Sequence, residues 1–573
     1  MNLPQLDLYK YYNDKETIMV RILITACILI VTGCDPIKKA DKIFINGNIW
    51  TGVKNGSRAD FIAISGESIM DVGHGDYKHV QGPDTELIDL QGDFVVPGFM
   101  DNHTHFMSGG FQILSIDLRD ANSKTEFIQR IEDYVSKLDE NEWITGGDWD
   151  HELWGGELPE REWIDTITEN NPLFIGRVDG HMALANSLAL ELAGITAQTQ
   201  DPPGGMVVRD KMTGQPTGVL KDEAIGLVNR AMPEKTNEEL DNALNKAMEY
   251  AASLGVTQVH DMCSWEDLQT FQRNRSKLTL RIYALPWYTN WRRLIDLKKE
   301  KGPGDEWLRW NGMKAMMDGS LGSRTAWMHD PYLDDPSTSG LLVMADTMEF
   351  RKIMRDVDLA GIQLAVHAIG TMANEWILDA FVDLNRENGD RDRRSRIEHA
   401  QHLTPNSIDR FKEQKVIPSM QPYHCIDDTR WMHKRIGPKV MKGTYVFRSF
   451  IDKNVNLTFG SDWTVAPLDP MKGIYAAITR KTIDGSYPDG WYPDQRITVE
   501  EALHCYTSNS AFSGFQEQRL GTLEKGKLAD FVVLSKDLTS IDPDEILNTI
   551  VLRTIVGGND SYIRSVEKNL TWH

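Results

Sequence analysis

Short apolar runs alternate with helical patterns through the middle of this 573-residue chain, and this alternation restricts the folds it can adopt. Eight runs have this character: VVPGFMDNH, VTQVHDM, LRIYALP, GMKAMMD, QLAVHAI, SRIEHAQ, VIPSMQP and VNLTFGSD. A strand followed by a helix is the repeating unit of a parallel sheet, so eight units predict a closed (β/α)8 barrel. The predicted fold class is therefore α/β, with a TIM barrel over residues 94–479.

The spacing of these runs is uneven near the start of the barrel. The second run begins at Val256, and far more residues separate it from the first run than one crossover needs. Residues 107–250 are therefore predicted to form a subdomain inserted after the first strand. Within it we expect a strand from Leu173 to Val178 and a Gly-rich hairpin around GGMVVRDKMTGQPTGVL.

Both ends of the chain carry strand-like runs that are broken by Gly and Asn. KIFINGNIW, FIAISGESIMDVG and ELIDLQGDFVVPGF lie near the start, and LGTLEKGKLADFVVL begins at Leu520. Their β-branched and aromatic content predicts strands. Residues 35–93 and 480–573 are predicted to build one small composite β domain, resembling a sandwich, outside the barrel.

Residues 1–34 have the layout of a secretory signal. The apolar run from Ile22 to Val31 is shorter than the ~20 residues that span a bilayer. The tetrad that ends at Cys34 resembles a bacterial lipobox, in which the Cys becomes the lipidated first residue, and residues 1–18 would then precede the true start. We expect a lipid-anchored protein of the bacterial cell envelope that faces the periplasm or the exterior. The alternative is a short core helix.

Composition excludes several classes of protein. Hydrophobic residues make up 41% and charged residues 25% of the chain, which is ordinary for a globular protein. Beyond the signal only Cys263, Cys425 and Cys505 remain, an odd number that cannot form a disulfide framework. The net charge of −22 argues against a nucleic-acid partner. The expected partners are a small-molecule substrate and, through lipid, a membrane, and a homo-oligomer is left open.

Polar side chains stand at the ends of several predicted strands, where the loops of a (β/α)8 barrel form the catalytic mouth. His103 and His105 are two residues apart, so both imidazoles lie on one face of a strand. Three further runs carry a possible metal ligand near their end: His367, His399 and Asp462. Each alone could be a core histidine or a capping aspartate, but their recurrence at the ends of predicted strands predicts a metal site.

The fourth run, GMKAMMD, carries Lys314, and alternation places this residue on the same side as Asp318. A bare ammonium repels divalent cations and is costly inside a barrel. The amine would fit the site after it has taken up carbon dioxide, because the carbamate is an anionic ligand that can bridge two metals. The alternative is a lysine that reaches the barrel mouth or pairs with Asp318.

Taken together, the His-x-His pair, Lys, His, His and Asp on strands 1, 4, 5, 6 and 8 resemble the amidohydrolase superfamily. KAMMDGSLGSRTA, HAIGT, RIEHAQ, SMQPYH, GSDW and GTLEKGKLADFVVL resemble its amidohydrolase 3 branch, which includes YtcJ-like proteins and N-substituted formamide deformylases. The resemblance extends from Ala40 to Val533. Thr371 in HAIGT and Trp463 after the aspartate depart from the pattern.

The resemblance implies metal-assisted hydrolysis. His103 and His105 would hold a buried metal, and His367 and His399 an outer one, with carbamylated Lys314 as the bridge. Imidazole-rich ligation favours one or two zinc ions, which lower the pKa of water toward ~7 and so supply hydroxide. Asp462 would contact the metal, orient that hydroxide, accept its proton and return it to the leaving nitrogen.

Substrate recognition is expected to come from polar and aromatic residues near the same mouth. The candidates are Asp148, Trp149, Asp179, His181, Arg324, His424 and Trp463. Arg324 is a candidate to pair with a substrate carboxylate, because a guanidinium can bind a carboxylate through two hydrogen bonds. The alternatives are that GGDWD is only a turn and that Arg324 forms a structural ion pair, and His402 is interpreted as a supporting residue.

The leading hypothesis is a metal-dependent amidohydrolase that acts on a C–N bond outside ordinary proteins. A second hypothesis keeps the site but changes the bond to that of a dipeptide, an N-acyl amino acid, a cyclic amide or an ester. A third is a catalytically dead envelope binding or scaffold protein. The presence or absence of bound metal would separate the third hypothesis from the first two.

Overall fold

The computed structural model describes residues 38–54, 57–177, 182–202, 205–344 and 346–565. The predicted signal segment with Cys34 lies outside these residues, and so do Asp179 and His181. Within the described part of the chain, no helix combines the length and the apolar character needed to cross a membrane.

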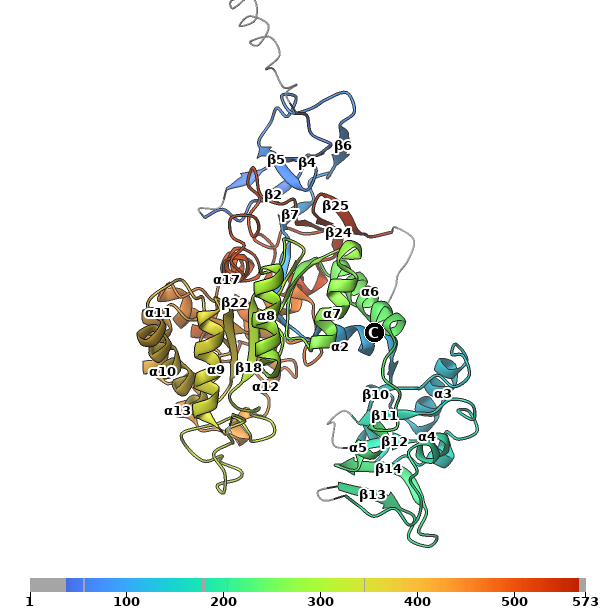
Figure 1. Cartoon of the computed structure of the whole chain (residues 1–573). Coiled ribbons are helices and arrows are strands. Elements are labelled where there is room, and N and C mark those ends of the chain that lie inside the picture. Colours follow the sequence, from blue (N-terminus) through green and yellow to red (C-terminus); the bar gives the residue numbers. More distant parts are fainter. Residues whose placement is uncertain (1–37, 55–56, 178–181, 203–204, 345, 566–573) are drawn as a thin grey trace, which may run out of the picture.

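The centre of the molecule is an α/β unit with two parallel sheets (Figure 1). The first sheet has the order β17 (Leu308–Arg309), β16 (Arg281–Ala284), β15 (Val256–Asp261) and β8 (Phe99–Thr104). The second has the order β18 (Gly312–Met316), β19 (Gln363–Ala368), β20 (Arg396–His399), β21 (Ile417–Met420) and β22 (Thr458–Phe459). Each of the eight predicted runs contains one of these strands, so the prediction of a TIM-barrel-like α/β fold is confirmed.

The edges of the two sheets meet at two parallel bridges. One bridge joins Thr104 to Trp463, and the other joins Trp287 to Lys314. At the first, the N–H of Asp462 donates to the carbonyl of His103 over 2.7 Å. Residues near the start and near the end of the central unit are therefore neighbours at one seam.

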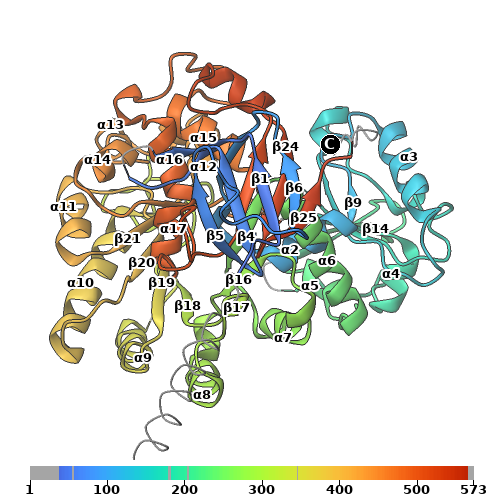
Figure 2. The same ribbon diagram turned by 90° about the horizontal axis from the view of Figure 1, so that it is seen from above.

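Helices lie around the outside of these strands (Figure 2). They are α7 (Trp265–Arg273), α8 (Trp291–Lys301), α9 (Thr347–Leu359), α10 (Thr371–Asn388), α11 (Pro405–Gln414), α12 (Pro422–Asp428), α13 (Pro438–Met441), α14 (Phe447–Asp452) and α15 (Pro470–Thr479). Ser264 and Asp267 form a capping box that begins α7, and Thr404 caps α11 with Pro405 in its first turn. Apolar residues of strands and helices share one large buried cluster.

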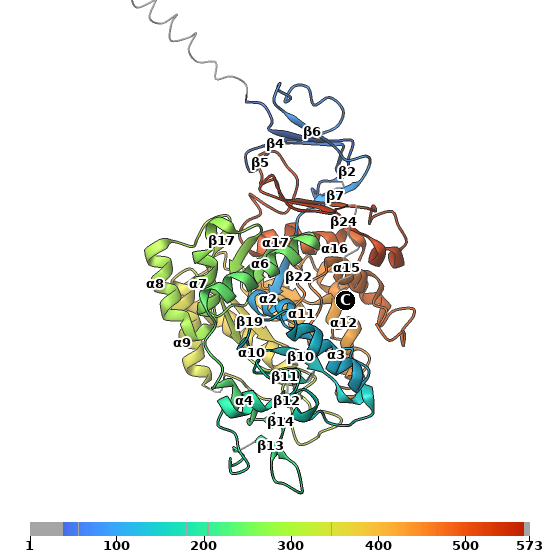
Figure 3. The same ribbon diagram turned by 90° about the vertical axis from the view of Figure 1, so that its right-hand side faces the viewer.

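Two further sheets join the start and the end of the chain at one end of the molecule (Figures 1 and 3). One has the order β5 (Ser68–Gly73), β4 (Phe61–Ser65), β1 (Lys42–Ile45) and β6 (Glu86–Asp89). The other has the order β25 (Asn559–Ile563), β24 (Val551–Val556), β23 (Phe531–Leu534), β7 (Phe94–Pro97), β2 (Asn48–Trp50) and β3 (Arg58–Ala59). Phe44 and Phe531 meet edge to face between them, with ring centroids 5.0 Å apart.

Two segments lie on the other side of the predicted domain boundaries. Strand β7 pairs with β2 and β23, so residues 94–97 belong to the small β domain although the predicted barrel begins at residue 94. Helices α16 (Val499–Tyr506) and α17 (Ser508–Ser513) contact β8 and β22, although residues 480–573 are predicted to lie outside the barrel. The buried side chains of Leu503 and Tyr506 join the large central cluster, which explains this placement.

A lobe at the opposite end of the molecule is built from the residues between β8 and β15 (Figure 3). Its sheet has the order β13 (Gly205–Arg209), β14 (Pro216–Asp222), β12 (Met182–Ala185), β11 (Phe174–Arg177), β10 (Gly146–Trp149) and β9 (Ile116–Asp117). Its helices are α3 (Lys124–Val135), α4 (Ser187–Leu192) and α5 (Ile225–Asn229). The predicted strand corresponds to β11, and the predicted hairpin corresponds to β13 and β14.

Helices α2 (Phe106–Leu114) and α6 (Asn237–Ser253) flank the lobe and pack against each other. A Cβ atom on Gly110 would lie 2.1 Å from the carbonyl oxygen of Ala243, so only Gly permits this close approach. Both helices contribute buried residues to the central cluster. The lobe therefore begins after α2 and ends before α6, and it is shorter than the predicted insertion of residues 107–250.

Candidate active site

The predicted ligand residues converge at the carboxyl ends of the parallel strands. They are His103 and His105 at the end of β8, Lys314 in β18, His367 in β19, His399 in β20 and Asp462 after β22. The ring centroids of His103 and His399 are 4.9 Å apart, and those of His367 and His399 are 4.4 Å apart. Residues that are hundreds of positions apart in the chain therefore share one small volume.

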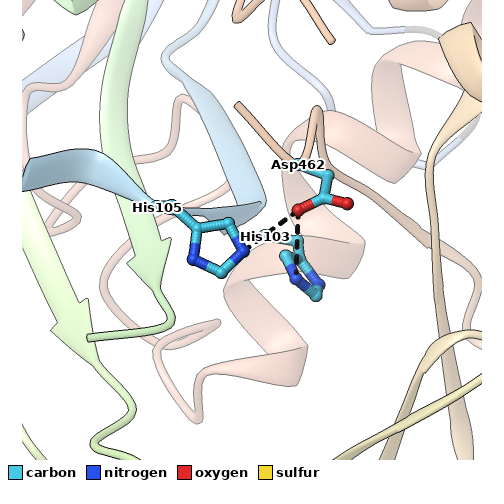
Figure 4. A group of neighbouring side chains, drawn as sticks. All are labelled: His103, His105 and Asp462. Atoms are coloured by element: carbon cyan, nitrogen blue, oxygen red, sulfur yellow. Dashed lines mark ion pairs between the residues drawn. The ribbon is translucent and has the colours of Figure 1, made fainter. Parts of the chain in front are cut away.

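His103, His105 and Asp462 form a compact trio (Figure 4). The Oδ1 atom of Asp462 lies 3.2 Å from Nε2 of His105 and 3.6 Å from Nε2 of His103. This oxygen is buried and makes no hydrogen bond among the described residues. A buried carboxylate oxygen that lies between two imidazole nitrogens is a donor set that suits a divalent cation.

Three of the imidazoles have one nitrogen committed to an oxygen acceptor. His103 donates from Nδ1 to Glu398 over 2.6 Å, and His399 donates from Nδ1 to Oε1 of Gln421 over 2.8 Å. His367 donates from Nε2 to the carbonyl of Gly319 over 3.1 Å. Metal-ligating histidines almost always donate their other N–H in this way. The lone pair is then left on Nε2 of His103 and His399 and on Nδ1 of His367.

His424, predicted to contact substrate, lies beside these residues. Its ring is stacked at 6.3 Å on the ring of His399, and the two form a second trio with Asp462. The Nε2 atom of His424 is buried and has no hydrogen-bond partner within the part of the chain that the structure describes. His424 is therefore free to contact a ligand at the mouth.

Lys314 lies inside the cluster with only 1% of its surface exposed. Its Nζ atom is 3.1 Å from Nε2 of His103, and burial lowers the pKa of the amine to about 8. The carboxylate of Asp318 accepts backbone N–H groups of Trp327, Ile369 and Gly370. Asp318 thus serves the loops around the mouth rather than neutralising the lysine.

Burial sets the charge of the histidines. It lowers the pKa of His103 to about 4 and that of His367 to about 3, and it holds the pKa of His399 well below its usual range. All three are therefore neutral at pH 7, which is the form that binds metal. Burial alone would raise the pKa of Asp462, but the neighbouring imidazoles hold it well below its usual range, so it remains a carboxylate.

Two carboxylates that the sequence analysis missed support these residues. Asp101 accepts the backbone N–H groups of His103 and Ser461, each over about 3.0 Å, and so ties the end of β8 to the segment that carries Asp462. Glu398 holds the ring of His103 and is itself paired with Arg396. Charged residues inside runs that are otherwise apolar were the available signal, because a buried charge needs a partner.

Asp148 and Trp463 line one cavity of about 450 Å³ between the lobe and the mouth, together with Tyr250. Asp148 has a left-handed backbone with φ of 55° and pairs with Arg119 over 2.7 Å. Trp463 packs its ring against Tyr250 with centroids 5.4 Å apart. The two predicted substrate contacts therefore line the same cavity, and Trp463 directly follows Asp462 in the chain.

Two other predicted contacts have different surroundings. Trp149 is fully buried in the core of the lobe and donates to the carbonyl of Ile175, so its prediction as a substrate contact is corrected to a core role. Arg324 donates to both carboxylate oxygens of Asp334, which matches the structural ion pair considered as its alternative. Asp179 and His181 stay predictions, because they lie outside the described residues.

Comparisons with known proteins identify relatives along nearly the whole chain. The model of the Amidohydrolase family (Amidohydro_3) matches residues 86–562. Protein LONG AFTER FAR-RED 3 of Arabidopsis thaliana is 40% identical over 539 residues, covering 91% of this chain and 92% of that protein. Putative amidohydrolase YtcJ of Bacillus subtilis is 31% identical over 538 residues, covering 91% and 99%.

A solved structure shows the same fold. An uncharacterized metal-dependent hydrolase from Pyrococcus horikoshii superposes with a TM-score of 0.73 at 29% identity, covering 88% of this chain and 99% of that one.

We expect His367 to be a metal ligand and His424 to be a substrate contact, because the ring of His367 is held by the hydrogen bond from its Nε2 atom to the carbonyl of Gly319. We expect His367→Ala to weaken zinc binding by about 10- to 100-fold, because it removes a ring whose second nitrogen is already anchored. His424→Ala should bind zinc as the wild type does. Competition of the metal-free proteins with a chromophoric chelator measures both affinities. An equal loss in His424→Ala would instead assign a metal to the trio of His399, His424 and Asp462.

Proposed function

The chain belongs to the metal-dependent amidohydrolase family, as its motifs predict, and from this premise we propose that it hydrolyses an amide-type C–N bond of a small molecule rather than an ordinary peptide bond. The observation that carries this proposal is the convergence of several imidazoles and the carboxylate of Asp462 at one barrel mouth. We propose further that the two parallel sheets act as one closed barrel, with the lobe as its insertion and the two terminal sheets as a composite domain.

The residues present fit a divalent cation. In the proposal, His103 and His105 would hold an inner ion, His367 and His399 would hold an outer one, and Lys314, as its carbamate, would be a ligand shared by both. Zinc is favoured because the donors are mainly imidazoles. A bound zinc ion lowers the pKa of water and polarises a carbonyl oxygen, and a single ion held by part of this set would supply the same chemistry.

Asp462 is the proposed general base and acid. It is ionised at neutral pH, and its Oδ1 atom makes no hydrogen bond among the described residues, so it can accept a proton from water. It would then return that proton to the leaving nitrogen. The backbone N–H groups of His103 and Ser461 donate to Asp101 from either side of this seam, and these hydrogen bonds keep the carboxylate of Asp462 in place during both transfers.

The cavity beside Trp463 is the proposed site for the part of the substrate that does not react. Its walls combine the aromatic rings of Trp463 and Tyr250 with the charged pair of Arg119 and Asp148. The Nε2 atom of His424, which has no hydrogen-bond partner among the described residues, would add a polar contact to the substrate at the mouth. These features suit a small molecule with both apolar and polar groups. A dipeptide, an N-acyl amino acid, a cyclic amide or an ester are the alternative substrates of the same site.

We expect zinc-loaded protein to hydrolyse members of a panel of N-formyl, N-acyl and dipeptide compounds, and Asp462→Asn to lower kcat by about 100-fold or more, because an amide cannot carry the proton. Asp358→Asn is the matched control, since Asp358 is buried but pairs with Arg391 and Arg393 away from the mouth. Metal analysis and steady-state kinetics provide the readouts.

Two results would contradict this assignment. Near-normal kcat in metal-loaded Asp462→Asn would remove the proposed role of the carboxylate. Pure wild-type protein that neither binds zinc nor hydrolyses any compound of the panel would favour the binding or scaffold hypothesis over the enzyme.

The carbamate should form faster as pH rises. Carbon dioxide reacts with the neutral amine, and a pKa of about 8 for Lys314 means that the neutral fraction grows about tenfold from pH 7 to pH 9. Carbon-13 NMR of metal-free protein, at a fixed concentration of dissolved ¹³CO2, should show this increase in the initial rate of labelling. Lys314→Ala should show no such carbamate signal. An equal signal in that variant would place the modification elsewhere, and a free amine in active, metal-loaded protein would exclude the bridge.

We propose that the mature protein is anchored in the bacterial cell envelope by lipid on Cys34, facing the periplasm or the exterior. The support is the short apolar run followed by the lipobox-like tetrad. Cys34→Ala should move the protein from the membrane fraction to the soluble fraction when membranes are separated by centrifugation. Unchanged fractionation, with residues 1–33 still present by mass spectrometry, would show that the anchor is absent.

A further inference from the structure

A buried ion pair contacts His103, one of the two proposed ligands of the inner ion. Arg396 and Glu398 are two residues apart on β20, and neither has any exposed surface. The guanidinium donates to the carboxylate from Nε over 2.8 Å and from Nη2 over 3.1 Å. Two unit charges deep in a barrel persist only where both are paired and hydrogen-bonded, so the pair must satisfy a local requirement.

That requirement is visible at His103. The second carboxylate oxygen of Glu398 accepts the Nδ1 proton of His103 over 2.6 Å. The same carboxylate also faces the guanidinium of Arg396, which donates to both of its oxygens, so Glu398 is held between a cation and the ring N–H of His103. An ionised carboxylate fixes the proton on Nδ1 and leaves the lone pair of His103 on Nε2, the atom that faces Asp462.

The pair is connected further across the barrel. Arg396 donates from Nη1 to Nδ1 of His260 over 2.8 Å, so the proton of neutral His260 is on Nε2. This Nε2 atom lies 3.0 Å from the amide nitrogen of Gln258, whose oxygen is buried and has no hydrogen-bond partner among the described residues. A half turn of that amide would let its oxygen accept the proton, provided that the amide of Gln516 turns with it, because Gln258 now donates to Oε1 of Gln516 over 2.8 Å. Gln258 in turn contacts Gln516, in the segment that follows α17.

We infer that Glu398 and Arg396 are positioning residues, which select the tautomer and orientation of His103, and that His260, Gln258 and Gln516 extend this control to the chain segment after α17. The five residues make a continuous buried path from that segment to a proposed metal ligand. This inference rests on the proposed metal site for its purpose, but the contacts themselves do not depend on the identity of the substrate.

The chain contains a matched control for this pair. Arg281 and Asp530 form a second buried, bidentate ion pair, with bonds of 2.7 and 2.9 Å. Their side chains are 1% and 3% exposed, and the pair joins β16 to the segment before β23, away from the mouth. Replacing Asp530 by Asn therefore removes a comparable buried charge without touching the histidines.

Glu398→Gln tests the inference, because the amide keeps the size of the side chain but loses the charge and has only one oxygen in place of the two that accept from Arg396 and His103. We expect zinc affinity to fall by about 10- to 100-fold, measured by chelator competition. Asp530→Asn should lower the thermal midpoint by a similar amount and leave zinc affinity unchanged. In ¹⁵N-histidine NMR of metal-free protein, the strongly hydrogen-bonded Nδ1 proton of His103, assigned with His103→Ala, should be lost in Glu398→Gln only.

Glu398→Asp is the second variant if Glu398→Gln does not fold. It keeps the charge but shortens the reach, and it should weaken zinc binding less than removal of the charge. Wild-type zinc affinity and an unchanged Nδ1 signal in either folded variant would overturn the inference. An equal loss of zinc affinity in Asp530→Asn would overturn it too, by showing a general effect of destabilisation. Wild-type protein that binds no zinc would instead refute the proposed function.

Discussion

The seam between β8 and the segment after β22 is the contact on which the rest of the site depends. Asp101 accepts backbone N–H groups from both sides of it, and a Cβ on Gly460 would lie 2.5 Å from the backbone nitrogen of His103. The close approach therefore requires Gly at this position. Because the seam brings together segments about 360 residues apart in the chain, neither the His-x-His pair nor Asp462 forms a metal site by itself.

Desolvation shifts the pKa values of the side chains at this seam. The same burial that lowers the pKa of the histidines would raise the pKa of a lone carboxylate, as it does for Asp101, whose pKa rises to about 7. Asp462 escapes this effect because imidazoles surround it. The mouth therefore holds neutral nitrogen donors beside an ionised oxygen donor at neutral pH.

The strands and their polar ends were predictable because each signal is local: an apolar run, a helical pattern and a polar residue at the boundary. His367 and His399 were identified in this way. Glu398 and Trp149 were not, because their roles depend on distant partners. Glu398 holds the ring of His103, which is 295 residues away in the chain, and Trp149 is buried in the lobe core, where it donates to the carbonyl of Ile175 on β11. The placement of α16 and α17 against the barrel follows equally from packing, not from local pattern.

In this chain, the proposed metal ligands and the proposed substrate cavity depend on different parts of the fold. The proposed ligands all come from the strand ends of the central unit, whereas the lobe contributes Asp148 to the cavity beside Trp463. Trp463 follows Asp462 directly, so one short segment carries both the proposed base and a wall of the cavity. Recognition can therefore change through the lobe while the seam and its charges stay the same, which is how barrel enzymes commonly diversify through their loops.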